Sequence, residues 1–211
     1  MIFNEHLELV GKHAPFAPSS PYWLKYDEDR LINYYISNYA TQIGTSLHEL
    51  AADLISSKER LGKADKKFVS FHLRKAGFSK KFIKRYVGPF YPMFMTYVND
   101  AIELGLQPEK QLYYSDLFFG TADAIEYFEH KNLLEIHDLK TGTTPAKMEQ
   151  LECYAALYCL EYKVDPLKIN FELRIYQGEE VIVHKPEPKT IREHADRIVH
   201  FNKVLNNFME E

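Results

Sequence analysis

The sequence predicts an α/β fold in which a mixed central sheet is flanked by helices. The main observation is the order of patterns along the chain, which is helix, three strands, helix and strand. A second observation is a helical stretch rich in lysine, arginine and aromatic residues at 58–106, which we interpret as a basic lobe inserted before the strands. A length of 211 residues is enough to bury a sizeable core, so we expect one domain over residues 1–211.

The composition is that of a folded chain. Hydrophobic residues make up 45% of it and no polar low-complexity tract is visible, which excludes an intrinsically disordered protein. The amino-terminal residues lack the basic start and apolar run of a signal peptide, and no stretch approaches the length of a membrane span. We therefore expect a soluble, intracellular protein of the cytoplasm with no membrane partner.

Residues 13–26 contain turn-forming proline and serine residues and end in an aromatic patch around Tyr22, Trp23 and Tyr26. We interpret this segment as an irregular hydrophobic plug over the core. The alternative is that Trp23 stacks on a nucleic-acid base.

A helical pattern follows from residue 29 to residue 57. Its apolar residues form one stripe, and His48 lies beside that stripe. A histidine at such a border is more often a core residue with satisfied hydrogen bonds than a metal ligand, so only the other motifs can decide its role. The stripe consists of Ile43, Leu47, Leu50, Ala51, Leu54 and Ile55.

The segment 58–106 is expected to form two or three helices, broken at Gly77 and at Gly88-Pro89. Between Lys58 and Arg85 there are eleven Lys or Arg and two acids, a net charge of +9, whereas the whole chain has −4. This segregation indicates attraction to phosphate groups. The alternative is that the charges only keep an aromatic lobe soluble. The predicted DNA contacts are Lys80, Lys81, Lys84 and Arg85.

Residues 118–128 and 133–140 predict an antiparallel hairpin, because both are rich in aromatic and branched residues and 129–132 is a polar break of hairpin length. A loop centred between positions 130 and 131 would place Asp123 opposite Asp138. Opposed residues in such a pair have Cβ atoms roughly 4.5 to 5.5 Å apart, where like charges are destabilising unless something compensates. A divalent cation would compensate.

Lys140 lies two positions after Asp138 and therefore projects from the same sheet face. Magnesium and manganese prefer oxygen ligands, commonly one or two carboxylates completed by water and substrate phosphate. A lysine beside such an ion can orient the attacking water and stabilise the charge that grows on a phosphate. These residues together predict hydrolysis of a phosphodiester.

Residues 141–145 predict a turn, with Pro145 at the first position of a helix. Gln150 and Tyr154 lie one turn apart on that helix and share a face that can meet the metal site. The alternative is an ordinary interior amide and ring. Two strands around Gly178 and a carboxy-terminal amphipathic helix from Lys189 to Met209 complete the pattern.

The ordered motifs resemble the PD-(D/E)XK nuclease superfamily, and more narrowly its RecB-like, CRISPR-associated-type exonuclease branch of phage or recombination enzymes. The resemblance implies a restriction-endonuclease-like core and a Mg²⁺ or Mn²⁺ ion held by His48, Asp123, Asp138 and the backbone carbonyl of Leu139. It also implies Lys140 as the catalytic lysine, with Gln150 and Tyr154 aligning the substrate or the neighbouring strand. The matching residues are Gly44-Thr45-Ser46-Leu47-His48-Glu49, Gly120-Thr121-Ala122-Asp123, Asp138-Leu139-Lys140, Gln150 and Tyr154.

The implied activity is that of a metal-dependent deoxyribonuclease, an exonuclease acting on DNA with single-stranded character or free ends. Several members of the branch hold an iron–sulfur cluster with four cysteines, which the two cysteines here cannot supply. Cys153 and Cys159 lie six apart on a predicted helix, so a disulfide between them is not expected either. Two alternatives stay open: a non-catalytic nucleic-acid-binding module on the same fold, and a hydrolase for a small phosphorylated molecule.

Overall fold

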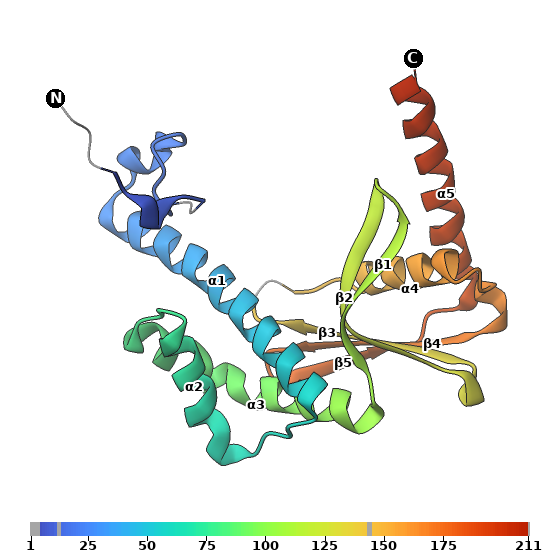
Figure 1. Cartoon of the computed structure of the whole chain (residues 1–211), viewed down its shortest axis with the longest axis horizontal. Coiled ribbons are helices and arrows are strands. Elements are labelled where there is room, and N and C mark those ends of the chain that lie inside the picture. The colour runs from blue at the N-terminus through green and yellow to red at the C-terminus, as the bar shows by residue number, and fades with distance from the viewer. Residues whose placement is uncertain (1–4, 12–13, 143–144, 211) are drawn as a thin grey trace. The chain divides into compact units, whose positions relative to one another are not determined.

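The computed structural model describes residues 5–11, 14–142 and 145–210 (Figure 1). It divides into two compact units, Met1–Ile43 and Gly44–Glu211, each of which is described by itself. Helix α1 (Glu28–Ser57) crosses the boundary between them. Asp27 precedes α1 and its carboxylate accepts the backbone N–H of Arg30 at 2.8 Å, which accounts for the start of the helix.

The first unit contains two short 3-10 helices, Leu7–Leu9 and Pro21–Lys25, before α1. Trp23 packs edge-on against Phe16, with 5.9 Å between the ring centroids, and its indole N–H donates to the carbonyl of Ala17. Trp23 is half-buried by these local contacts. They favour a packing role for Trp23 over base stacking, whereas the plug over the core stays a prediction.

The second unit is built on a five-stranded sheet in the order β1-β2-β3-β4-β5. Every neighbouring pair is antiparallel except β3 and β4, which are parallel and joined through helix α4 (Glu149–Glu161). The sheet is therefore mixed and flanked by helices, which confirms the predicted α/β class. The strands are β1 (Gln107–Ser115), β2 (Phe118–Phe128), β3 (Leu133–Lys140), β4 (Asn170–Gln177) and β5 (Glu180–His184).

Helices cover the sheet in two groups (Figure 1). Helix α4 packs on strands β1 to β4, and helix α5 (Pro188–Glu210) packs on α4. Helix α3 (Lys80–Leu104) packs on β3 and β4, where Tyr97 meets Tyr176 edge-on at 5.3 Å between ring centroids. Helix α2 (Lys66–Lys75) packs on α3. The core under α4 and α5 includes Leu134, Ile136, Leu151, Ala155, Phe171, Leu173, Ile191 and Ala195.

The predicted hairpin is confirmed with the predicted bounds, and its register runs from Phe128–Leu133 to Ala124–His137. The expected pairing of Asp123 with Asp138 is not part of this register, because the paired stretch ends at Ala124. The turn at Gly178, with φ of +62°, is also as predicted.

Two expected helix boundaries are wrong. Helix α3 continues through Pro89 and Pro92 instead of breaking at Gly88-Pro89, because a fully buried face packs along its length and outweighs the missing backbone donors. Gly77, with φ of +96°, does separate α2 from α3. Helix α4 begins at Glu149 rather than at Pro145, and the N–H of Ala146, outside the helix, donates to the Gln177 side chain. Positions 143–144 of the predicted turn lie outside the described residues.

Both cysteines are expected to be buried as small hydrophobic residues; this is confirmed for Cys159 and wrong for Cys153, which is exposed, and both are free thiols. Among the described residues, no helix combines the length and apolar character that a membrane crossing requires.

Candidate functional site

Backbone pairing between strands β2 and β3 ends just before Asp123 and Asp138, the two acids that the sequence predicted for the site. Beyond this point a side chain, and not the backbone, bonds to the neighbouring strand. The carboxylate of Asp123 accepts the backbone N–H of Leu139 at 2.8 Å. This bond replaces the ladder bond that a continued register would supply. It holds the Asp123 carboxylate against β3, one residue from both Asp138 and Lys140. The carbonyl of Leu139 as a metal ligand stays a prediction.

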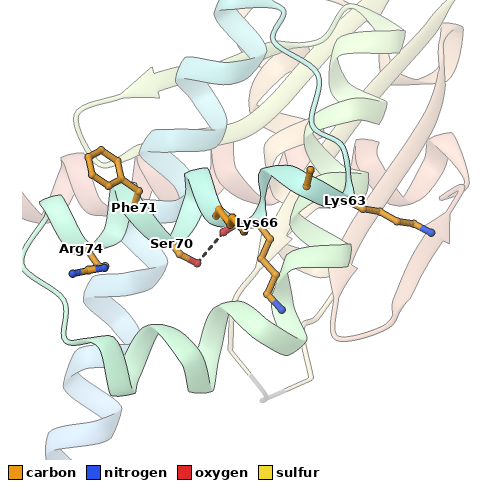
Figure 2. Close-up of a pocket in the computed structure, with 7 residues that line it drawn as sticks. Lys63, Lys66, Ser70, Phe71 and Arg74 are labelled. Carbon is orange, nitrogen blue, oxygen red and sulfur yellow. Dashed lines mark hydrogen bonds between the residues drawn. The ribbon is translucent and has the colours of Figure 1, made fainter.

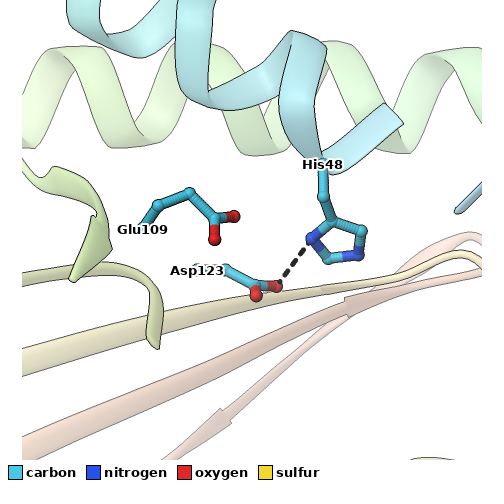
Figure 3. A group of neighbouring side chains, drawn as sticks. All are labelled: His48, Glu109 and Asp123. Atoms are coloured by element: carbon cyan, nitrogen blue, oxygen red, sulfur yellow. Dashed lines mark ion pairs between the residues drawn. The ribbon is translucent and has the colours of Figure 1, made fainter. Parts of the chain in front are cut away.

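Three elements bring together a group that could hold a metal ion (Figure 3). His48 comes from α1, Glu109 from β1 and Asp123 from β2, and one ligand atom from each lies within 4.8 Å of the other two. His48 Nδ1 is 3.3 Å from Asp123 Oδ2. Two carboxylates and an imidazole suit a divalent cation such as manganese or magnesium. His48 and Asp123 are therefore placed together as the sequence predicted.

Glu109 is the member of this group that sequence reasoning missed. It lies between the pairs Pro108–Ala124 and Lys110–Ala122, which places it level with Asp123 on the neighbouring strand. Its φ of +49° is in the left-handed region, which costs a residue with a side chain of the order of 1 to 3 kcal/mol and is concentrated at functional sites. Locating β1 and its register would have revealed Glu109.

The ionisation of this group reflects an excess of negative charge. Burial alone lowers the pKa of His48, but its hydrogen bond to Asp123 and the charges of Asp123, Asp138 and Glu109 outweigh burial and raise the pKa. The pKa of Glu109 is raised by burial of its carboxyl group and by the charge of Asp123. Both shifts favour the bound proton, as expected where a cation would be stabilised.

Asp138, Lys140, Gln150 and Tyr154 form a continuous chain of polar contacts. Lys140 Nζ donates to Asp138 Oδ1 at 3.0 Å and to Gln150 Oε1 at 2.9 Å, and Gln150 Nε2 donates to the Tyr154 hydroxyl at 3.2 Å. Asp138 and Lys140 therefore share a sheet face, and Gln150 and Tyr154 share the helix face that meets them. Both placements were predicted from spacing.

Asp138 is 2% exposed, and its environment is short of hydrogen-bond donors. Lys140 Nζ is also 3.0 Å from Oδ2, but it is aligned for a hydrogen bond only with Oδ1, so the buried Oδ2 has a charge contact without a hydrogen bond. Burial and the nearby charge of Asp123 raise the pKa of Asp138 to about 6, despite the opposing effects of Lys140 and His48. A buried carboxylate oxygen of this kind fits a cation ligand.

Two glycines of the predicted motifs allow close approaches around the site. A Cβ at Gly120 would lie 2.8 Å from Cε1 of Tyr154, so the tyrosine ring packs directly on the β2 backbone. A Cβ at Gly44 would lie 2.7 Å from Oγ1 of Thr141, the residue after Lys140. A side chain at either position would collide with a neighbouring side chain near Lys140, so close packing and not backbone conformation explains both glycines.

A cavity of about 680 Å³ opens beside Lys140. Arg85 lines it from α3, together with residues at and after the ends of β3 and β4. Lys80, Lys81 and Lys84 are exposed on α3 and are not among the described residues that line it. The described lining residues are Arg85, Pro89, Phe90, Lys140, Thr141, Gly142, Pro145, Gln177, Gly178 and Glu179.

Comparison with protein-family models finds no match for this sequence, and comparison with curated proteins finds no significantly similar sequence.

Proposed function

We propose that the protein is a metal-dependent deoxyribonuclease, an exonuclease with a restriction-endonuclease-like core. The supporting observation is the hydrogen bond from the Leu139 N–H to Asp123. It joins the His48, Glu109 and Asp123 group to the strand that carries Asp138 and Lys140. Ligands for a divalent ion and a charge-paired lysine thereby meet at one place, an arrangement that suits metal-assisted hydrolysis of a phosphodiester.

His48, Glu109 and Asp123, together with Asp138, would hold Mg²⁺ or Mn²⁺. When bound, such an ion polarises a phosphoryl oxygen and lowers the pKa of coordinated water. The cysteine content leaves no iron–sulfur cluster to consider.

The side chains of the protein supply positioning and charge. Asp138 and Gln150 both hold the Lys140 ammonium, which would there stabilise the negative charge that grows on a phosphate oxygen. Tyr154 holds Gln150 in turn. Arg85 supplies a second cation to the cavity beside Lys140, where it would bind a phosphate of the substrate.

The decisive experiment is digestion of end-labelled linear DNA and circular DNA with magnesium, manganese or EDTA. We expect metal-dependent loss of linear DNA, with manganese at least as effective as magnesium because the His48 imidazole is a softer ligand than oxygen. Lys140→Met should lower the rate by about 100-fold or more, as removal of a transition-state donor does. Asp116→Asn, at an exposed turn, is the matched control.

Each alternative gives a different result in the same assay. A non-catalytic module would bind DNA in calcium but degrade neither substrate in any metal. A hydrolase for small phosphorylated molecules would cleave p-nitrophenyl phosphate and leave DNA intact. Either result would overturn the proposal.

A further inference from the structure

A second hollow, of about 600 Å³, lies on the surface of α2 and the short helix before it, Lys63–Asp65 (Figure 2). It lies outside the cavity beside Lys140, since the two have no lining residue in common. Its described lining residues are Lys63, Ala64, Lys66, Lys67, Ser70, Phe71 and Arg74.

The hollow is strongly cationic. Four of its seven lining residues are Lys or Arg and none is acidic. Within the described part of the chain, none of these four cations forms an ion pair with a carboxylate. The Ser70 hydroxyl donates to the backbone carbonyl of Lys66 at 2.8 Å, so the cations are the donors available to a ligand. Such a surface attracts phosphate groups.

Phe71 gives the hollow an apolar surface that packing does not explain. It is 65% exposed, while α2 is held to its neighbours by the buried side chains of Val69 and Leu73. Lys67 lies four positions before Phe71 and Arg74 three positions after it, so both flank the ring on the helix surface. An aromatic ring between two cations is the pattern that binds a base together with its phosphates in single strands.

The hollow lies next to the helix that reaches the candidate site. Lys66 Nζ is 3.7 Å from the point where a side chain on Gly88 would begin. Gly88 is followed on α3 by Pro89 and Phe90, which line the cavity beside Lys140. A strand bound in the hollow can therefore continue along α3 toward Lys140 over a surface that includes Lys66 and Arg85.

We propose that this hollow is a binding subsite for an unpaired stretch of single-stranded DNA, in which Phe71 stacks on a base and Lys67 and Arg74 bind the adjacent phosphates. The choice of DNA rests on the proposed nuclease function. The subsite goes beyond that function because it selects unpaired strands: a base inside a duplex is stacked on its neighbours and cannot stack on Phe71.

The test measures binding by the full chain in EDTA, where no metal-dependent cleavage occurs. Fluorescence anisotropy follows a labelled oligo-dT strand and a labelled blunt duplex over a salt series. Phe71→Leu should weaken oligo-dT binding about tenfold and leave duplex binding unchanged, while Phe71→Tyr should bind as the wild type does. Phe119→Leu is the matched control, because Phe119 is also 65% exposed but lies on β2.

The salt dependence of binding tests separately how much the two cations, Lys67 and Arg74, contribute to DNA affinity. Lys67→Gln combined with Arg74→Gln should reduce the slope of log affinity against log salt by roughly 1.4, because each phosphate of a single strand that is no longer neutralised lowers the slope by about 0.7. Unchanged oligo-dT affinity in Phe71→Leu, an equal loss for duplex, or an unchanged salt slope would each overturn the subsite.

Failure of the subsite can be distinguished from failure of the proposed function. Metal-dependent degradation of DNA with normal binding by the variants would overturn the subsite alone. Binding through Phe71 without degradation in any metal would overturn the nuclease function alone.

Discussion

Replacing Gly120 with alanine tests the chain of contacts that positions Lys140. The new Cβ would lie 2.8 Å from Cε1 of Tyr154, well inside the roughly 3.5 to 4.0 Å at which carbon atoms attract. The contact is with a rigid ring and not with the end of a flexible side chain. Tyr154 must therefore move, and its hydroxyl must move away from Gln150, which holds Lys140.

The expected loss of stability is small and the loss of activity larger. Overpacking costs about 1 to 3 kcal/mol, and alanine recovers about 0.4 to 1 kcal/mol by restricting the unfolded chain. The net effect is a loss of about 1 kcal/mol in the free energy of unfolding. Displacement of Gln150 leaves Lys140 held only by Asp138, and we expect about a tenfold fall in kcat/KM for DNA.

Urea denaturation measures the stability change as a lower midpoint with an unchanged slope. Gly142→Ala is the control for the stability measurement alone, because no atom of the described residues lies within 4 Å of its added Cβ, while Gly142 itself lines the cavity beside Lys140. Combining Gly120→Ala with Tyr154→Leu should cost less than the sum of the two single changes, since the second removes the clash. Additive costs, or a Gly120→Ala protein with normal stability and activity, would refute the reasoning.

Three other sets of substitutions probe the metal ligands, the buried carboxyl group and the cavity. Glu109→Gln and His48→Ala should each weaken Mn²⁺ binding in calorimetry, because each removes one of three clustered ligands, and unchanged affinity would exclude that residue from the site. In EDTA, Asp138→Asn should be more stable than the wild type well above pH 6 but not below pH 3.8. The reason is that the pKa of Asp138 is raised from 3.8 to about 6 in the folded protein, so the wild type loses stability as the pH rises through this interval. A stability difference between the two proteins that does not vary with pH would contradict this. Arg85→Gln should raise KM for DNA several-fold and Lys80→Gln less, because only Arg85 lines the cavity beside Lys140, and equal increases would place the substrate elsewhere.

Local sequence patterns predicted the parts of the site on β3 and α4, because the geometry of those parts is local. A four-residue connection determines the β2–β3 register, and strand alternation then places Lys140 beside Asp138. Helical spacing likewise places Gln150 and Tyr154 on one face. Each of these relations spans few residues, so no knowledge of the tertiary structure was needed.

The predictions that were wrong or incomplete concern features that local sequence does not determine, namely where paired strands separate and what a helix packs against. The hairpin register alone cannot reveal that pairing ends at Ala124, which leaves the Asp123 side chain to accept the Leu139 N–H. The expected break at Gly88-Pro89 failed because buried contacts of α3 outweigh the local effect of proline. Glu109 lay in a polar, proline-containing segment that does not resemble a strand in isolation.

The addition of Glu109 changes the charge balance at the site. Three carboxylates, those of Glu109, Asp123 and Asp138, gather around two groups that can carry positive charge, His48 and Lys140. Lys140 also donates a hydrogen bond to Gln150, so its ammonium group does not serve the carboxylates alone. The pKa values of His48, Glu109 and Asp138 are all raised, which favours the bound proton and so reduces the net negative charge. Repulsion among the three carboxylates and the burial of Asp138 both oppose folding. A bound divalent cation would offset this cost at the same three carboxylates, which is why we assign the cluster to function rather than to folding.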